Sequence, residues 1–216
     1  MESGEATVFV IDDDAEVRDA LDRLLRSAGW RVVSHDSALS FLDQPPLAGS
    51  GCILLDVNMP GMTGPQLHDQ LRERGISLPV IYLTGQCSVS IGVRAMKQGA
   101  LDFLEKPVDA DALLPAIELA VARHRQTRNL EHRMDEIEQR LARLSARERE
   151  VMDHVIAGRL NKQIAADLGI AEKTVKVHRG RVMSKMCVRS VAELVHLCDE
   201  RGIGRRDGSL VRPAFG

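Results

Sequence analysis

The segment Val8-Phe9-Val10-Ile11-Asp12-Asp13-Asp14 places four apolar residues directly before three carboxylates. Three further apolar runs also end at polar side chains: Cys52 to Leu55 before Asp56, Val80 to Leu83 before Thr84, and Leu101 to Leu104 before Glu105-Lys106-Pro107. Short apolar runs that alternate with helix-like stretches are typical of buried parallel strands in a doubly wound α/β sheet. Ligands bind at the carboxyl ends of such strands, so we expect these polar groups to converge there.

The stretches between the runs have the spacing of helices. Asp14 is placed to cap a helix that carries Val17, Leu21, Leu24, Leu25 and Ala28 and ends at Gly29. A second strand is predicted from Trp30 to His35, and Ser37 is placed to cap a short helix after it. Further helices are predicted around Leu67 and Leu71, and around Ile91, Ala95 and Met96. The result is a five-stranded parallel sheet with right-handed crossovers.

The residue types at the predicted sheet edge suit phosphoryl chemistry. Mg²⁺ prefers oxygen ligands in octahedral geometry and keeps several waters, so one or two carboxylates and a backbone carbonyl are enough to hold it. Asp12, Asp13 and Asp56 supply the carboxylates, and Thr84 and Lys106 supply a hydroxyl and an ammonium group beside them.

The charge of the chain is divided unevenly. The net charge of the 216 residues is −2. Residues 1–144 carry 15 Lys and Arg against 22 Asp and Glu, a net of −7, and residues 145–216 carry 14 against 9, a net of +5. An acidic front and a basic back indicate two modules, of which the second suits a polyanion.

The sequence favours a cytoplasmic protein. The acidic start Met1-Glu2-Ser3-Gly4-Glu5 lacks the layout of a signal peptide. No apolar stretch approaches the roughly 20 residues that cross a bilayer, so no membrane partner is expected. Cys52, Cys87, Cys187 and Cys198 have no CxxC spacing, and we interpret them as reduced thiols rather than a metal site or a disulfide.

Residues 111–144 contain no Gly and only one Pro, Pro115, which predicts a long helix. Its later apolar residues are Leu130, Met134, Ile137, Leu141 and Leu144, spaced 4, 3, 4 and 3. This is a heptad pattern of about two repeats, with Arg133 and Glu138 at flanking positions. Two interpretations remain open: the seam of a parallel dimer, or a stripe that packs on a domain of the same chain.

The basic back module has the pattern of a four-helix helix-turn-helix domain. Ser145-Ala146-Arg147-Glu148 has the form of a capping box and opens a first helix. Asn161 is placed to cap a second helix, Gly169-Ile170 to make a tight turn, and residues 171–186 and 190–199 to form two more helices. Val175, Val182 and Met186 are expected to face inward, so that the basic side chains of the third helix face outward, as in a helix that enters the major groove.

The front motifs together resemble the receiver domain of two-component response regulators. The resemblance is carried by Ile11-Asp12-Asp13-Asp14, Asp56-Val57-Asn58-Met59-Pro60-Gly61, Thr84-Gly85 and Glu105-Lys106-Pro107. It implies that Asp56 is the phosphorylated nucleophile, and that Asp13, Asp56 and the Asn58 carbonyl hold Mg²⁺ while Asp12 acts largely through water. It further implies that Thr84, Lys106 and Phe103 read the phosphoryl group, and that the Lys106–Pro107 bond is cis.

The back motifs resemble the LuxR-type effector domain. They are Leu144 to Val151, Asn161-Lys162-Gln163-Ile164-Ala165 and Thr174-Val175-Lys176-Val177-His178. The resemblance implies base contacts by Lys176 and Val177. Contacts mostly to phosphates are implied for Thr174, His178, Arg181 and Lys185, and backbone approach for Lys162 and Gln163, with Lys173 on the same basic face. Gly180 departs from relatives that carry a reading side chain there, and close approach to DNA or to a neighbouring helix would explain it.

With both halves together, the chain resembles FixJ/NarL-type response regulators. In its long linker and in the motif residues of its recognition helix it is most similar to the StyR and TodT branch. The expected boundaries are a receiver at 6–122, a linker helix at 123–143, a helix-turn-helix domain at 144–202 and a disordered tail at 203–216. The expected function is that of a transcriptional regulator, not an enzyme. Its expected partners are a sensor histidine kinase, double-stranded promoter DNA, a second copy on activation and, as a further candidate, RNA polymerase.

Two other function classes remain to be excluded. A metal-dependent phosphohydrolase with an Asp nucleophile needs a second acid–base carboxylate, which Asp56-Val57-Asn58 does not supply. An adaptor whose C-terminal helices bind protein would lack the steep salt dependence that counterion release gives to DNA binding.

Overall fold

The computed structural model describes residues 6–43, 49–85 and 99–200. The chain divides into two compact units between Asn129 and Leu130, and each is described by itself. The predicted helix around Ile91, Ala95 and Met96, the thiol of Cys87 and the tail 203–216 lie outside the described residues.

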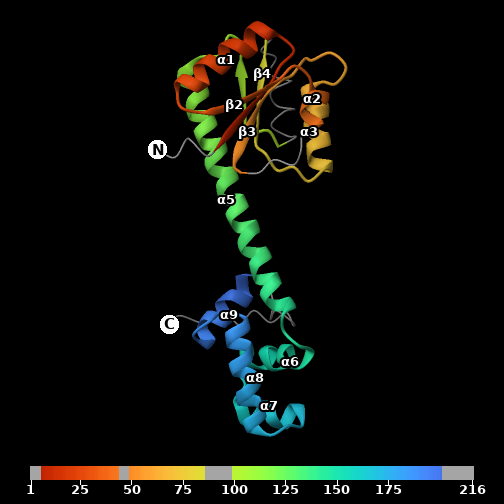
Figure 1. Cartoon of the computed structure of the whole chain (residues 1–216), viewed down its shortest axis with the longest axis vertical. Coiled ribbons are helices and arrows are strands. Elements are labelled where there is room, and N and C mark those ends of the chain that lie inside the picture. Colours follow the sequence, from red (N-terminus) through yellow and green to blue (C-terminus); the bar gives the residue numbers. More distant parts are fainter. Residues whose placement is uncertain (1–5, 44–48, 86–98, 201–216) are drawn as a thin grey trace, which may run out of the picture. The chain divides into compact units, whose positions relative to one another are not determined.

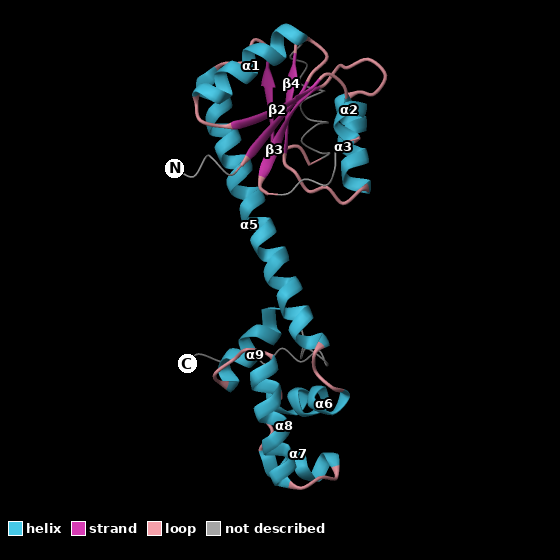
Figure 2. Cartoon of the chain, viewed as in Figure 1, coloured by secondary structure: helices cyan, strands magenta, loops and turns pink. Residues whose placement is uncertain are grey.

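The first unit is built on a five-stranded parallel sheet in the order β2-β1-β3-β4-β5, drawn as arrows in Figure 2. The strands are β1 (Thr7–Ile11), β2 (Arg31–His35), β3 (Gly51–Asp56), β4 (Val80–Thr84) and β5 (Asp102–Glu105). The central strands β1, β3 and β4 are almost wholly buried, because helices cover both faces of the sheet. The predicted doubly wound sheet is confirmed.

Helices pack on the two faces of this sheet in pairs (Figure 1). The helices α1 (Ala15–Ser27) and the first part of α5 (Ala110–Ala142) share one core, in which Leu25, Leu54 and Ile117 are fully buried. On the other face, α2 (Ala38–Leu42) and α3 (Gly64–Glu73) share a second core around Phe41, Leu67 and Tyr82. Because the sheet is clamped between two cores, the strand ends that carry the polar residues are held in fixed positions.

The caps predicted for two of these helices are present. The Asp14 carboxylate accepts hydrogen bonds from the backbone N–H groups of Glu16 and Val17 at 2.9 and 3.4 Å. The Ser37 hydroxyl accepts one from the N–H of Ser40 at 3.2 Å. Each cap satisfies a donor that the first turn of a helix leaves without an intrahelical partner.

The middle of α5 is anchored to the loop that leads into β3. The N–H of Gly51 donates to Nδ1 of His124 at 3.0 Å in a buried position. Beside it, Arg125 Nε donates to the Ser50 hydroxyl at 3.2 Å, and Arg128 donates to the Gly49 carbonyl. The first unit therefore contacts α5 beyond its apolar core, as far as Arg128.

The second unit contains α6 (Ala146–Ile156), α7 (Asn161–Leu168), α8 (Glu172–Lys185) and α9 (Val191–Glu200). The capping box at α6 is confirmed: Ser145 N–H donates to Glu148 Oε2 at 2.9 Å, and the Ser145 hydroxyl accepts from Glu148 N–H at 3.2 Å. The turn between α7 and α8 passes through Gly169 at φ 63°, a backbone conformation that glycine adopts without strain. This is the predicted helix-turn-helix arrangement.

Asn161 does not cap α7 as predicted. Leu160 occupies the cap position, and its N–H donates to the Gln163 side chain at 2.9 Å. Asn161 lies one residue further on, inside the helix, where its Oδ1 accepts a hydrogen bond from Arg179 Nη1 of α8 at 2.6 Å. The prediction was wrong because the Asn side chain has a stronger partner, a guanidinium group 18 residues away.

The last turns of α5 belong to the core of the second unit. Ile137 and Leu141 are buried there with Val151, Val175 and Leu194, and Met134 and Leu144 pack against the same core. Leu130 is 58% exposed. Of the two interpretations of the heptad pattern, the structure therefore supports packing within the chain for every position after Leu130.

None of the helices in the described part of the chain has both the length and the apolar character needed to cross a membrane.

Candidate functional site

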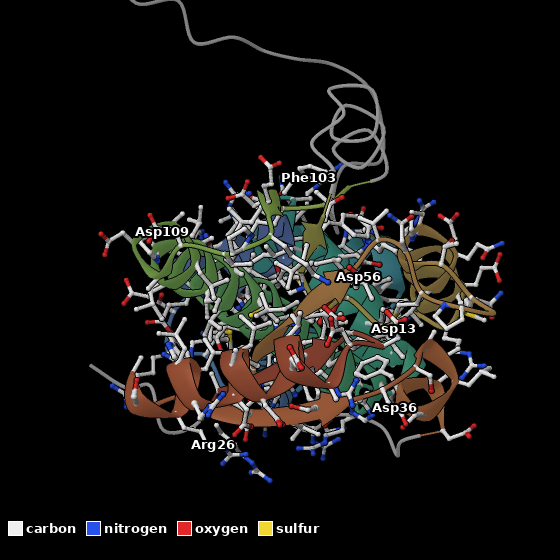
Figure 3. All side chains as sticks on the ribbon, turned by 90° about the horizontal axis from the view of Figure 1, so that it is seen from above. Asp13, Arg26, Asp36, Asp56, Phe103 and Asp109 are labelled. Carbon is white, nitrogen blue, oxygen red and sulfur yellow. The ribbon has the colours of Figure 1, made fainter. Side chains whose placement is uncertain are left out.

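Three carboxylates meet at the carboxyl edge of the parallel sheet. Asp12 and Asp13 follow β1, Asp56 ends β3, and one oxygen of each lies within 4.8 Å of the others. Asp12 is fully buried and Asp56 is 5% exposed, whereas Asp13 is exposed. Figure 3 looks onto this edge and labels Asp13 and Asp56. The predicted convergence of the three carboxylates is thus observed.

Lys106 brings a positive charge to the same cluster from the end of β5. Its ammonium group lies 2.5 Å from Asp12 Oδ2 and donates to Asp56 Oδ1 at 2.6 Å. The main chain fixes its position, because Lys106 N–H donates to the Thr84 carbonyl at 2.7 Å. The Lys106–Pro107 peptide is cis, as predicted. One ammonium group therefore bridges two carboxylates that come from different strands.

The electrostatics of the cluster are dominated by burial. Burial raises the pKa of Asp12 above its usual value, although the hydrogen bond from Lys106 and the N–H of Asp14 oppose that rise. For Lys106, burial alone would lower the pKa, but the hydrogen bonds and charges of Asp12 and Asp56 outweigh it and the pKa rises. Outside its ion pair with Lys106, the buried Asp12 Oδ2 has no hydrogen-bond partner of good geometry among the described residues. Such an oxygen is suited to a cation.

The donor set fits Mg²⁺. It offers three carboxylates within reach of one ion, a buried Asp12 oxygen whose ion-pair partner is the ammonium group of Lys106, and the exposed loop residue Asn58, two residues after Asp56. Hard divalent cations prefer oxygen ligands of this kind and retain water on the exposed side, which here is the side of Asp13.

The loop after β3 fixes the orientation of Asp56. Asn58 N–H donates to Asp56 Oδ2 at 2.7 Å, and the Thr63–Gln66 capping box begins α3. Gly64, at the start of α3, lies against this strand end: a Cβ added there would meet the Asp56 carbonyl oxygen at 2.3 Å. Sequence reasoning missed this role of Gly64, because a glycine after a turn looks like any other loop glycine.

Thr84 and Phe103 lie on the two neighbouring strands. Thr84 ends β4 and is fully buried. Phe103 lies on β5 in register with Tyr82 of β4, and it is half-buried against the α2–α3 core (Figure 3). Thr84 therefore occupies the strand end at which the sequence predicted it, and Phe103 lies within the predicted last strand.

The outer face of α8 carries most of the predicted DNA contacts. Lys173, Thr174, Lys176, Val177 and Arg181 are exposed, and His178 is half-buried. Val175, Val182 and Met186 are buried, as predicted, and fix which side of the helix faces inward. On α7, Lys162 and Gln163 are also exposed. Lys162, Lys173, Lys176 and Arg181 have no ion-pair partner among the described residues.

Lys185 has a different environment from the other predicted contacts. Its ammonium group pairs with the buried Glu148 at 2.6 Å and donates to the Arg143 carbonyl at 3.0 Å. The hydrogen bond from Lys185, followed by that from the Ser145 backbone, lowers the pKa of Glu148 to about 2. Lys185 therefore ties α8 to α6 and to the end of α5, and its predicted phosphate contact stays a prediction.

Comparisons with known proteins agree with this architecture. Residues 8–118 match the family model of the response regulator receiver domain, and residues 142–198 match that of bacterial regulatory proteins of the luxR family. The chain is 44% identical over 200 residues to the transcriptional regulatory protein FixJ of Azorhizobium caulinodans, covering 93% of this chain and 95% of that protein. It is 39% identical over 199 residues to the response regulator protein TodT of Pseudomonas putida, covering 92% and 88%.

A solved structure of the response regulator StyR matches with a TM-score of 0.86 and 45% identity, covering 91% of this chain and 99% of that one. The full-length structure of FixJ from B. japonicum matches with a TM-score of 0.55 and 42% identity, covering 91% and 97%. These similarities agree with the acidic cluster, the parallel sheet and the helix-turn-helix described above. The chain therefore belongs to the two-component response regulators that carry a LuxR-type DNA-binding domain.

Proposed function

We propose that this chain is a transcriptional regulator switched by phosphorylation of Asp56, with the phosphoryl group supplied by a phosphohistidine of a sensor histidine kinase. The observation that carries the proposal is the environment of Asp56. It is a nearly buried carboxylate with an ammonium group 2.6 Å from Oδ1 and two more carboxylates beside it. A purely structural ion pair has no need of the second and third carboxylates, which repel one another.

In this proposal a carboxylate oxygen of Asp56 attacks the phosphorus, the bond from phosphorus to the histidine nitrogen breaks, and an acyl phosphate forms. Lys106 offsets negative charge on the transferred oxygens, and Asn58 N–H holds Asp56 Oδ2 in place. Bound Mg²⁺, held by Asp12, Asp13, Asp56 and the Asn58 carbonyl, would supply a Lewis acid for the same charge. The site therefore acts mainly by positioning and charge neutralisation.

The new phosphoryl group adds about −1.5 to −2 charges and several acceptor oxygens. Thr84 is placed on the adjacent strand end to donate its hydroxyl to them, and Phe103 is placed to move inward as the Thr84 side chain turns. The proposed result is a changed outer surface near β5 that favours a dimer. The dimer would place two copies of α8 one turn of promoter DNA apart, roughly 34 Å. RNA polymerase, bound at the same promoter, is a further candidate partner of this dimer.

The test is phosphorylation of the purified chain by acetyl phosphate with Mg²⁺, read by intact mass. We expect the wild-type chain to gain the mass of one phosphoryl group and Asp56→Asn to gain none, while its melting curve shows a folded protein because the side chains are nearly isosteric. Asp69→Asn is the matched control, since Asp69 is an exposed carboxylate on α3. Phosphorylation of Asp56→Asn, or none of the wild type, would refute the proposal.

A further inference from the structure

Gly180 lies in the interior of α8, eight residues after its first residue and five before its last. Glycine destabilises a helix interior relative to alanine, because it has more conformational freedom to lose. Close packing usually explains such a glycine, but a Cβ added at Gly180 would meet nothing within 4 Å. No helix in the described part of the chain therefore requires glycine here, and of the two explanations that the sequence left open, close approach to DNA remains.

The position of Gly180 around the helix is informative. Val175, Val182 and Met186 are buried and mark the inward direction of α8. At about 100° per residue, Gly180 lies roughly 140° from that direction. The exposed residues Lys173, Val177 and Ser184 lie within about 60° of it by the same count. Gly180 is thus near the centre of the outward face.

The surroundings of Gly180 indicate what meets this face. Lys176 and Arg181 are exposed cations on either side of it, and Val177 is 47% exposed although it is apolar. The acidic residue of α8, Glu172, is in its first turn, away from Gly180. Cations around an exposed apolar side chain suit a polyanion that also offers apolar surface, as the major groove does with its thymine methyl groups.

We infer that Gly180 is a specificity-determining residue: its Cα hydrogens contact base edges, and the missing side chain lets the α8 backbone lie deeper in the major groove. A Cβ would extend about 1.5 Å from Cα toward the base pairs, which is enough to separate surfaces in van der Waals contact. The inference rests on the proposed DNA-binding function. It differs from the predicted contacts of Lys176 and Val177, because it assigns a role to the backbone.

The experiment compares Gly180→Ala with the wild-type chain on two probes: a duplex selected from a random pool by the wild-type protein, and the unselected random pool. We expect Gly180→Ala to bind the selected duplex about tenfold more weakly or worse, and the pool within about twofold of the wild type. Its melting temperature should rise by a few degrees, on the order of 5 °C, because alanine favours the helix and its Cβ enters open space.

Ser184→Ala is the matched control, since it also raises helix propensity on the exposed face but adds no atom. Ser184→Ala should bind both probes like the wild type.

The outcomes separate this inference from the proposed function. Should the wild-type chain enrich no duplex from the pool, the DNA-binding function itself fails. If the wild type binds its selected duplex and Gly180→Ala binds it equally well or better, the function stands and the inference is overturned. Equal losses on both probes would assign the contact to phosphates rather than bases and would also overturn it, as would a lowered melting temperature.

Discussion

Asp12 illustrates the tension in the receiver site. It is fully buried, its pKa is raised mainly by burial, and it lies beside two other carboxylates, while among the described side chains its ion-pair partner is the ammonium group of Lys106. An acid whose pKa is raised on folding holds its proton more tightly in the folded state. Its charged form at neutral pH therefore works against stability. A bound cation would relieve this repulsion.

We therefore expect Asp12→Asn to raise the melting temperature measured without Mg²⁺, and to reduce the further rise that Mg²⁺ causes in the wild type. Thermal unfolding with and without the ion measures both. Asp14→Asn is the control, because Asn caps helices as well as Asp does and Asp14 lies outside the cluster. A lower melting temperature for Asp12→Asn in metal-free buffer would show that its ion pair with Lys106 outweighs the repulsion.

The pKa of Glu148 shifts in the opposite direction from that of Asp12. Its pKa falls from the usual 4.5 to about 2 because Lys185 and the Ser145 backbone bind the charged form. A lowered pKa gives stability that is fully present above about pH 4.5 and is lost as the pH falls toward 2. We expect the second unit to unfold in acid across this window. In Glu148→Gln the capping hydrogen bond to Ser145 persists but the charge is gone, so the pH dependence between 4.5 and 2 should flatten. Circular dichroism at several pH values tests this, and an unchanged acid transition would contradict it.

The second half of α5 is part of the helix-turn-helix core rather than a free linker. Ile137 is 2% exposed in that core and Leu130, seven residues earlier, is 58% exposed, although both occupy the same heptad stripe. Leucine and isoleucine spaced in this way suit a dimer seam and an intramolecular face equally well, so the spacing alone could not decide between them. The deciding information is tertiary, namely the apolar faces of α6, α8 and α9 that surround Ile137 and Leu141.

We expect Ile137→Ala to lower the free energy of unfolding of the second unit by about 2–5 kcal/mol, because it removes a buried side chain. Leu130→Ala should change it by less than about 0.5 kcal/mol, as is usual for an exposed position. Urea unfolding at several protein concentrations measures both values. Equal effects of the two substitutions, growing with protein concentration, would favour the dimer seam instead.

The elements that could be predicted from sequence are those with a local signal. Each of these elements is predicted by a pattern of only a few neighbouring residues. Examples are the strands before Asp12 and Asp56, the Ser145 capping box and the Gly169 turn. The ion pair of Glu148 with Lys185 and the contact of Gly64 with Asp56 join residues 37 and 8 positions apart. Neither pair produces a periodic pattern in the sequence, so only the folded structure reveals these two contacts. Asn161 was misassigned for the same reason, since its partner Arg179 comes from another helix.

The chain joins an acidic module to a basic one, and we expect the basic module to make DNA binding sensitive to salt. Lys162, Lys173, Lys176 and Arg181 are the exposed cations of the predicted interface. Each phosphate neutralised contributes about 0.9 to the slope of log affinity against log salt. Lys176 is predicted to contact base edges, so the three other cations give a slope of about −2.7 for one copy and about −5.4 for two copies bound together.

We therefore expect the slope on random duplex DNA to steepen by about a factor of two when the protein is treated with a beryllofluoride-type phosphate mimic and Mg²⁺. Fluorescence anisotropy across a salt series measures the slope, and light scattering on the same samples reports the mass. Arg181→Ala should reduce the slope by about one per copy. A slope that stays the same in both states, with an unchanged mass, would show that the phosphate mimic does not promote dimerisation.

The two-sided use of α8 sets limits on reprogramming this regulator for a new operator. Positions 173 to 181 hold the outward side chains, so a library built there can exchange contacts with little effect on the fold, provided that Val175 and the Arg179–Asn161 bond are kept. Lys185 looks like one more basic residue of the same helix, but replacing it would leave the buried Glu148 carboxylate without its ion-pair partner. A graft taken from another family member should therefore end before Val182, or bring its own partner for Glu148 with it.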